Sequence, residues 1–277
     1  EIKFEDYRLC DIWSNVKFEI NLKKSKIKDV SMLGNVHVLN LESCKNITDV
    51  SMLGKVHTLD LYGCVNITDV SMLGNVNNLD LSYCYDVIDL SIFGKSQHQK
   101  CCNETKWSCH TLNLSYCDDI IDVSMLGKVN NLNLYGCKNI TDVSMLENVT
   151  NLDLSYCSGV TDVSMLGNVH TLDLRFCENI TDVSMLGNIY SLNLRFCLNI
   201  TDISMLGKVH ILNLRYCISI TDVSMLGEVH TLNLYGCENI TDVSMLGNVI
   251  NLDLSCCINI PKYQIEKLKK TVKNLKY

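Results

Sequence analysis

One short motif recurs along almost the whole chain. The pattern LxLxxC places a cysteine every 20 residues, with a single interval of 33. The cysteines of this pattern are Cys44, Cys64, Cys84, Cys117, Cys137, Cys157, Cys177, Cys197, Cys217, Cys237 and Cys257. Near-identical units at a short fixed period predict a solenoid, in which each unit packs mainly against its two neighbours.

Each repeat is expected to contain a short strand followed by a tight turn. In the unit from Val169 to Asn188, the segment HTLDLR alternates, so Leu172 and Leu174 point to one side of an extended chain and polar residues to the other. The segment ENITDVSMLGN then forms a turn of helical or 3₁₀ character, and we expect Gly187 to let the backbone return. The apolar residues expected to point inward from this turn are Ile180, Val183, Met185 and Leu186. One unit cannot bury enough apolar surface to offset the entropy of ordering its residues, so the units must stack.

The two ends and one insertion depart from the pattern. Residues 1–35 are expected to form an N-terminal cap and a degenerate first repeat, which lacks the cysteine and has its apolar strand residues shifted by one position. Residues 36–260 form the solenoid, with a 13-residue insertion at 96–108. Residues 261–277 carry apolar side chains at helical spacing and predict an amphipathic C-terminal capping helix.

These motifs resemble the leucine-rich-repeat family. The consensus LxxLxLxxC followed by ITD is similar to the cysteine-containing subclass found in F-box leucine-rich proteins, and ITDVSML is similar to the internalin-type repeat. In its near-identical repeats and its lack of alanine, the chain also resembles leucine-rich proteins of large DNA viruses of amoebae, or of amoebae themselves. The resemblance implies an α/β-type solenoid with a parallel sheet on the concave face and short turns or 3₁₀ segments on the convex face.

The cysteine column has a structural interpretation and a chemical alternative. Neighbouring repeats bring the thiols close together, but their side chains run parallel into the core, and eleven of them cannot pair completely in disulfides. Buried cysteine serves as a small hydrophobic residue with a weak hydrogen-bond donor. We favour this role over metal binding or redox chemistry. Reduced thiols imply a cytoplasmic location, which is the host cytoplasm if the protein is viral.

The aspartates of the TD dipeptides form a second column. They are Asp29, Asp49, Asp69, Asp89, Asp122, Asp142, Asp162, Asp182, Asp202, Asp222 and Asp242. Each carboxylate can accept amide hydrogens at the start of the following turn. Stacked carboxylates repel one another, and a divalent cation could relieve that repulsion, but each repeat offers fewer oxygens than calcium requires. We therefore favour capping over cation binding.

Two further groups contain metal-ligand residue types. The insertion holds His98, Cys101 and Cys102, and Cys109 and His110 follow it, but their spacing fits no zinc motif and favours a surface loop. Histidines recur at one position of the repeat, which indicates copying rather than catalysis. They are His37, His57, His170, His210 and His230.

Composition and motifs argue against several classes of function. The formal net charge of −7 disfavours nucleic-acid binding, which depends on neutralising phosphates. The apolar runs are too short to cross a membrane. The sequence contains no phosphate-binding glycine loop, no HExxH motif and no GxSxG motif. We therefore expect a monomeric, non-enzymatic protein without a cofactor or a metal ion.

Binding residues are expected where exposed strand positions differ between repeats. The first such position holds only asparagine or aspartate, which indicates a polar ladder. The second is more variable, and three consecutive units carry an arginine there, followed by an aromatic residue. Arginine and aromatic residues are enriched at binding hot spots, and the fold does not require this pair; the alternative is recent duplication of one unit. The candidate partner-binding residues are Arg175, Phe176, Arg195, Phe196, Arg215, Tyr216 and Tyr235.

Three functions are compatible with the sequence. The first is a scaffold whose concave sheet binds another protein. The second, implied by the F-box resemblance, is the substrate-recognition subunit of a ubiquitin ligase; it needs an adaptor-binding helical module, and the segment EIKFEDYRLCDIWSN before the repeats does not resemble one. The third is a passive structural repeat protein, which predicts no specific partner.

Overall fold

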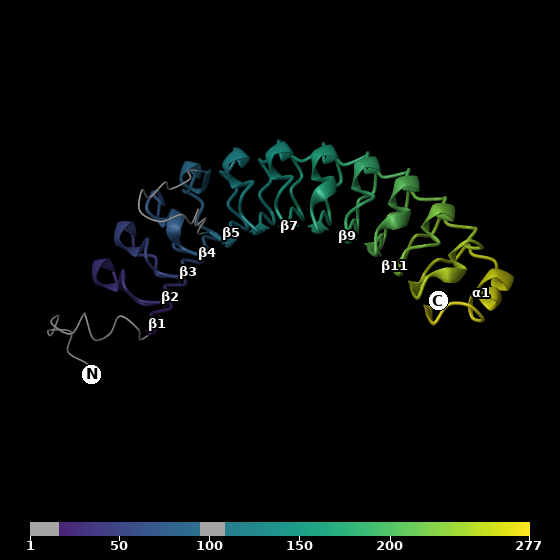
Figure 1. The fold of residues 1–277 in the computed structure, drawn as a ribbon, viewed down its shortest axis with the longest axis horizontal. Coiled ribbons are helices and arrows are strands. Elements are labelled where there is room, and N and C mark those ends of the chain that lie inside the picture. Colours follow the sequence, from purple (N-terminus) through teal and green to yellow (C-terminus); the bar gives the residue numbers. More distant parts are fainter. Residues whose placement is uncertain (1–16, 95–108) are drawn as a thin grey trace, which may run out of the picture.

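The computed structural model describes residues 17–94 and 109–277, which form one curved solenoid. Within these residues, thirteen parallel strands lie in a single sheet in the order β1 to β13. Figure 1 shows the strands along the inner side of an arc and the 3₁₀ turns along its outer side, with β1 and α1 at opposite ends. The predicted architecture, a concave parallel sheet with short convex turns, is confirmed.

Every strand contains three residues. The strands are β1 Glu19–Asn21, β2 Val38–Asn40, β3 Thr58–Asp60, β4 Asn78–Asp80, β5 Thr111–Asn113, β6 Asn131–Asn133, β7 Asn151–Asp153, β8 Thr171–Asp173, β9 Ser191–Asn193, β10 Ile211–Asn213, β11 Thr231–Asn233, β12 Asn251–Asp253 and β13 Asn274–Lys276.

The convex turns are short 3₁₀ helices. They are η2 Ser31–Leu33, η3 Ser51–Leu53, η4 Leu73–Asn75, η5 Ser91–Gly94, η6 Ser124–Leu126, η7 Ser144–Leu146, η8 Ser164–Asn168, η9 Ser184–Leu186, η10 Ser204–Lys208, η11 Ser224–Leu226 and η12 Leu246–Asn248.

The strands pair in register, so equivalent residues of successive repeats lie side by side. Leu172 pairs with Leu152 on one side and with Leu192 on the other. The pairing passes the insertion without interruption, because β4 pairs directly with β5. Any residue type kept at one position of the repeat therefore becomes a continuous column along the solenoid.

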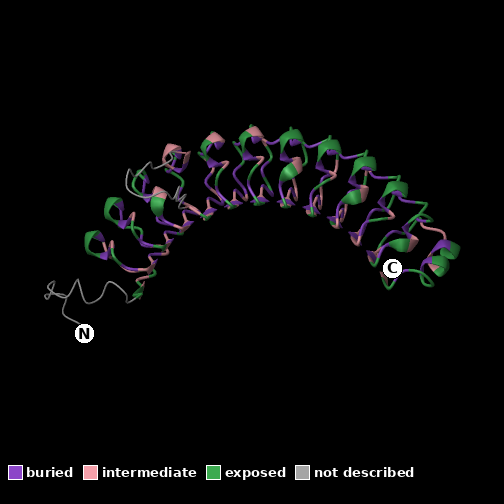
Figure 2. Ribbon diagram, in the orientation of Figure 1, coloured by how far each residue is buried: buried purple, intermediate pink, exposed green. Residues whose placement is uncertain are grey.

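The core consists of such columns. In the unit of β8 the buried residues are Val169, Leu172, Leu174, Cys177, Ile180, Val183 and Leu186, each at most 2% exposed. Figure 2 shows that buried segments of the ribbon recur in successive repeats along the arc. The alternating strand residues and the apolar turn residues thus form one shared core, as the repeat pattern predicts.

The cysteine column donates hydrogen bonds across the repeats. Each of the eleven thiols donates to the carbonyl oxygen of a leucine in the preceding unit, at sulfur–oxygen distances of 3.0–3.3 Å. Cys197, for example, donates to Leu174, whose oxygen also accepts the N–H of Cys177. The thiols are free and buried, as the structural interpretation predicts. Burial raises the pKa of the Cys177 thiol to about 12, so this group stays protonated and keeps its donor.

The methionines point outward, which corrects the expectation that Met185 lies inside. Met185 is 60% exposed, and all ten methionines of the chain are between 46% and 61% exposed. A 3₁₀ turn has three residues per turn, so residues three apart share a face. Val183 and Leu186 therefore share the inner face, and Met185 falls on the outer one.

The role of Gly187 also differs from the expectation. Its φ of −64° lies in the ordinary right-handed region, so the backbone conformation does not require glycine. Glu147 occupies the same place in its repeat with a φ of −56°. A Cβ atom on Gly187 would instead collide with the carbonyl oxygen of Met205 in the next repeat. The glycine permits close approach between turns and not an unusual turn geometry.

Both ends of the sheet differ in detail from the sequence prediction. The C-terminal helix α1 covers only Lys262–Leu268, because the chain then turns back and adds β13, whose Leu275 pairs with Leu252. Pairing with the last strand edge satisfies backbone groups that a longer helix would leave exposed. At the other end, Ile20 pairs with Leu39, so the degenerate repeat is one residue short and joins the sheet in register.

We predict that the thiol donor contributes measurably to stability. Cys197→Ala leaves a cavity and removes one of the two donors to the Leu174 oxygen, and we expect it to lower the free energy of unfolding by about 1–3 kcal/mol. Cys197→Ser keeps a donor at the same place and should lie between wild type and alanine. Urea denaturation followed by circular dichroism measures the order. A serine variant less stable than the alanine variant would contradict a role for the hydrogen bond.

Candidate binding surface on the concave sheet

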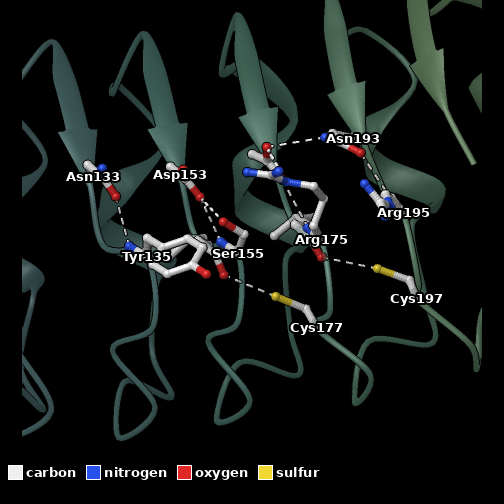
Figure 3. A network of polar contacts seen from close by, with 12 residues as sticks. Asn133, Tyr135, Asp153, Ser155, Arg175, Cys177, Asn193, Arg195 and Cys197 are labelled. Carbon is white, nitrogen blue, oxygen red and sulfur yellow. Dashed lines mark hydrogen bonds and ion pairs between the residues drawn. The ribbon is translucent and has the colours of Figure 1, made fainter. Parts of the chain in front are cut away.

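The asparagines and aspartates at the ends of the strands form the predicted polar ladder. The side-chain oxygen of each such asparagine or aspartate accepts the backbone N–H of the residue two positions later. Asp173, for example, accepts the N–H of Arg175 at 3.0 Å. Amide groups also bridge repeats, since the Asn193 side chain donates to Asp173 at 3.2 Å. Figure 3 shows the same arrangement at Asn133 and Asp153. The ladder fixes the backbone at the point where each strand ends.

The position that holds Arg175, Arg195 and Arg215 in three repeats is followed by a residue with a left-handed backbone conformation, and this is so in every repeat from β2 to β12. Its φ is 60° at Phe176 and 61° at Phe196. Three repeats place glycine there, at Gly63, Gly136 and Gly236, with φ between 65° and 75°. Residues other than glycine adopt this backbone conformation at a cost in free energy, so each aromatic residue here needs a compensating interaction.

Ring stacking supplies that interaction. Nine aromatic rings of successive repeats form one continuous column beside the arginines, with 4.2–5.2 Å between neighbouring centroids. The rings are Tyr62, Tyr83, Tyr116, Tyr135, Tyr156, Phe176, Phe196, Tyr216 and Tyr235. We call this column the ring ladder. It gives Phe176 and Phe196 a structural role, which differs from the expectation that the fold does not require them.

Each of these repeats contributes one ring to the ladder, by one of two routes. Some repeats read Ser-Tyr or Arg-Phe and place the ring at the left-handed position, whereas others read Tyr-Gly and place it one residue earlier. In two repeats of the second kind, the ring of the preceding repeat covers the glycine: a Cβ atom would lie 3.0 Å from the Tyr116 ring at Gly136 and 2.5 Å from the Tyr216 ring at Gly236. The compensating exchange of Tyr-Gly with Ser-Tyr is visible in the sequence and could have predicted the ladder.

The three arginines differ in their partners. The Nε–H of Arg175 donates to Oδ1 of Asp173 at 2.9 Å, and Nε lies 2.8 Å from Oδ2 in an ion pair. Burial raises the pKa of Asp173, and the backbone and side-chain donors of Arg175 partly offset that rise. Arg195 and Arg215 have no such carboxylate, because Asn193 and Asn213 occupy the equivalent position.

Aromatic rings hold the two unpaired guanidinium groups. The guanidinium carbon of Arg195 lies 5.0 Å from the centroid of Phe196, and that of Arg215 lies 4.0 Å from the centroid of Tyr235. The Nε atoms of both arginines are buried without a hydrogen-bond partner among the described residues. The structure therefore brings the seven predicted residues together as neighbours, in one band beside β8 to β11.

A second stack of rings borders the other end of these strands. The rings precede the strands by one residue, and neighbouring centroids are 4.5–4.8 Å apart. They are His170, Tyr190, His210 and His230. These histidines therefore pack against neighbouring rings of the same column, and the concave face over β8 to β11 lies between two columns of rings.

The aspartate column of the convex face caps the 3₁₀ turns. The Asp182 carboxylate accepts the N–H of Ser184 at 2.9 Å, and the same bond recurs along the column. The backbone N–H and hydroxyl of Ser184 hold the pKa of Asp182 below its ordinary value. Across residues 17–94 and 109–277, no three His, Cys, Asp or Glu side chains gather in a way that could hold a metal ion.

The remaining metal-ligand candidates lie at the insertion. His98, Cys101 and Cys102 fall outside the described residues. Cys109 is half-buried, and burial raises the pKa of its thiol to about 12. His110 directly precedes β5, and its backbone N–H donates to the carbonyl oxygen of Asn77. None of the described helices has the length and hydropathy of a membrane-spanning segment.

Comparison with known proteins supports the fold. No protein-family model matches the sequence, and no curated protein matches it. An internalin of Listeria monocytogenes aligns with a TM-score of 0.60 at 21% identity, over 95% of this chain and 88% of its own. The functional domain of InlJ from the same species, which includes a cysteine ladder, aligns with a TM-score of 0.44 at 20% identity, over 85% and 58%. A leucine-rich-repeat protein of Leptospira interrogans gives 0.46 at 15% identity, over 94% and 84%. The likeness to the first internalin shows that the chain has the leucine-rich-repeat fold.

We predict that the ring ladder stabilises the solenoid locally. Phe196→Ala removes a ring that stacks on Phe176 and Tyr216, at 4.6 and 4.7 Å, and should lower the free energy of unfolding by about 1–3 kcal/mol. Phe196→Tyr keeps the stack and should leave stability unchanged. Thermal and urea denaturation measure both. Equal stability of the alanine and tyrosine variants would show that the stack contributes nothing.

The capping aspartates predict a loss of stability in acid. Their pKa values are lowered in the fold, so their contribution is complete above the unfolded value of about 3.9 and is lost as the pH falls through the folded values. Burial raises the pKa of Asp60 and Asp173, and these two groups act in the opposite sense. We expect the urea concentration at the midpoint of unfolding to decrease once the pH is below about 4.

Three matched substitutions isolate the column from those two groups. Asp182→Asn, Asp202→Asn and Asp222→Asn together keep an acceptor for each serine N–H but remove three titrating groups. The triple variant should show a shallower fall of the urea midpoint between pH 5 and 3. An identical pH profile would show that other groups control acid unfolding.

Proposed function

We propose that the protein is a non-enzymatic scaffold that binds a partner protein through its concave sheet. The contact is centred on the seven residues Arg175, Phe176, Arg195, Phe196, Arg215, Tyr216 and Tyr235. The observation that carries the proposal is the pair Arg195 and Arg215, whose charged groups are held on the concave side by rings and have no acidic partner. At the corresponding position of three other repeats, the hydroxyls of Ser82, Ser115 and Ser155 donate to the side chains of Asp80, Asn113 and Asp153.

The interactions of the other reactive groups support the absence of catalysis. The buried thiols donate to carbonyl oxygens, and burial keeps those with raised pKa values protonated. The convex aspartates accept N–H groups of the turns, and His170, His210 and His230 pack against neighbouring rings. Groups engaged in this way are not poised for nucleophilic or acid–base chemistry.

A cytoplasmic location is part of the proposal. The asparagine of each NIT triplet is a potential glycosylation acceptor, yet its side-chain nitrogen is a donor within the fold: Asn179 donates to the carbonyl oxygen of Ser158 at 2.7 Å and Asn199 to that of Glu178 at 2.8 Å. Glycans on these nitrogens would disturb contacts between repeats. Fluorescence microscopy of a tagged chain in its native cell tests the location, and a secreted, glycosylated product would contradict it.

We predict that partner binding depends on the two unpaired arginines. Arg195→Gln with Arg215→Gln removes both charges and leaves every ring in place, so the solenoid should fold normally. Affinity purification from the native cell, followed by titration of the captured partner, should show binding weakened about tenfold or more, as for buried hot-spot arginines.

A matched control removes the same charge elsewhere. Lys55→Gln with Lys208→Gln neutralises two exposed lysines of the convex turns and should leave partner binding unchanged. Full partner binding by the arginine variant would refute the proposed surface. Absence of any specific partner of the wild-type chain would favour a passive structural role instead.

A further inference from the structure

The three stacked arginine repeats differ in a way that points to the chemistry of the partner. Arg175 has an internal carboxylate, since its Nε–H reaches both oxygens of Asp173. The next two repeats replace that aspartate by Asn193 and Asn213. Each asparagine oxygen still accepts the backbone N–H of the following arginine residue, at 3.2 and 3.1 Å, so the backbone geometry is kept and only the charge is lost.

No other acidic residue of these two repeats replaces the missing carboxylates. Between Ile189 and Glu228 the acidic residues are Asp202, Asp222 and Glu228. The two aspartates accept the N–H of the serine two residues later, on the convex side. Arg195 and Arg215 therefore place two positive charges side by side on a chain whose formal net charge is −7.

The guanidinium groups are positioned and unsatisfied. Rings lie 5.0 Å from Arg195 and 4.0 Å from Arg215, and neither guanidinium donates a hydrogen bond within the described residues. Holding a guanidinium in one orientation reduces the entropy lost on binding, and its planar donors match the two oxygens of a carboxylate. The natural ligand for such a pair is an anionic group with oxygen acceptors.

The rings beside the arginines exclude a flat ligand that stacks. Phe176 stacks on Tyr156 at 4.2 Å and on Phe196 at 4.6 Å, and Phe196 stacks in turn on Tyr216. Both faces of these two phenylalanines are thus covered by neighbouring rings. A ring stacked on both sides offers only its edge, which carries partial positive charge and favours an anion over a sugar or a base.

We infer that Arg195 and Arg215 bind carboxylate side chains of an extended, acidic segment of the partner protein, laid across the ends of β9 and β10. This inference rests on the proposed function and adds the chemistry of the partner. The chain as a whole carries a formal net charge of −7, whereas these two repeats present two unpaired positive charges on the concave side, so charge complementarity favours an acidic segment at this band.

A synthetic hexaglutamate peptide tests the chemistry directly. Isothermal titration calorimetry on the full chain should detect hexaglutamate binding, weaker at higher salt, and no binding of hexaglutamine. Inorganic phosphate serves as a second anion. Binding of phosphate without binding of hexaglutamate would overturn the assignment to a carboxylate segment, as would equal binding of hexaglutamine.

The decisive variants supply the missing partners while keeping both arginines. Asn193→Asp with Asn213→Asp recreates the Arg175–Asp173 arrangement in the next two repeats and should weaken hexaglutamate binding at least tenfold. Adjacent aspartates already occur in this column at Asp153 and Asp173, so the variant should fold, as circular dichroism can verify. The reverse change, Asp173→Asn, frees the third arginine and should strengthen binding several-fold.

A matched control separates pairing from general repulsion. Asn113→Asp with Asn133→Asp adds the same charge to the same column beside repeats that lack arginine, and should change hexaglutamate affinity by less than threefold. An equal loss in the control and in the Asn193→Asp, Asn213→Asp variant would overturn the inference.

The two proposals fail in different ways. The inference fails, and the proposed function survives, if the native partner requires Arg195 and Arg215 but neither that partner nor hexaglutamate responds to the added aspartates. The proposed function fails if the native partner still binds when both arginines are glutamine, whatever the peptide does.

Discussion

In-register stacking of short parallel strands is the constraint on which this molecule depends. Each residue lies beside the equivalent residue of the two neighbouring repeats, so a side chain is acceptable at a given position only if it interacts well with that position's other occupants. Leucine packs on leucine, the thiol of one repeat donates to a carbonyl oxygen of the previous one, and aromatic rings stack. The same rule explains why the repeats are so alike: a substitution in one unit alters its contacts with two others.

For charged residues, in-register stacking is unfavourable. Like charges one strand apart repel, and the concave face reduces that repulsion by mixing asparagine with aspartate at the end of the strands, where Asn193 donates to Asp173. The convex aspartates remain charged because each accepts hydrogen bonds from its own turn. In the arginine band, only the charge of Arg175 is compensated within the fold, by Asp173. Two neighbouring cations without an internal acid weaken the stack in which they lie, which is a reason to relate them to an external ligand.

Much of the fold follows from the sequence because the repeat period, the alternation of HTLDLR and the apolar residues after the cysteine depend on local geometry and burial alone. The cysteine donors and the capping aspartates follow for the same reason. The direction of Met185 does not, because it depends on the turn being 3₁₀, in which Val183 and Leu186 take the inner face. The predicted C-terminal helix is present, but its short length does not follow from the sequence, since the pairing of β13 with the sheet edge competes with the helical pattern.

The repeat pattern alone is enough to predict a solenoid with a concave sheet, a buried cysteine column and a band of arginine and aromatic residues on adjacent repeats. The interactions of each member of that band become clear only from the packing of the repeats against one another. Stacking between repeats makes the phenylalanines part of a continuous ladder, and the position two residues before each arginine decides whether its charge is neutralised. Such distinctions depend on distances between neighbouring repeats, and a linear pattern of nearly identical units does not contain them.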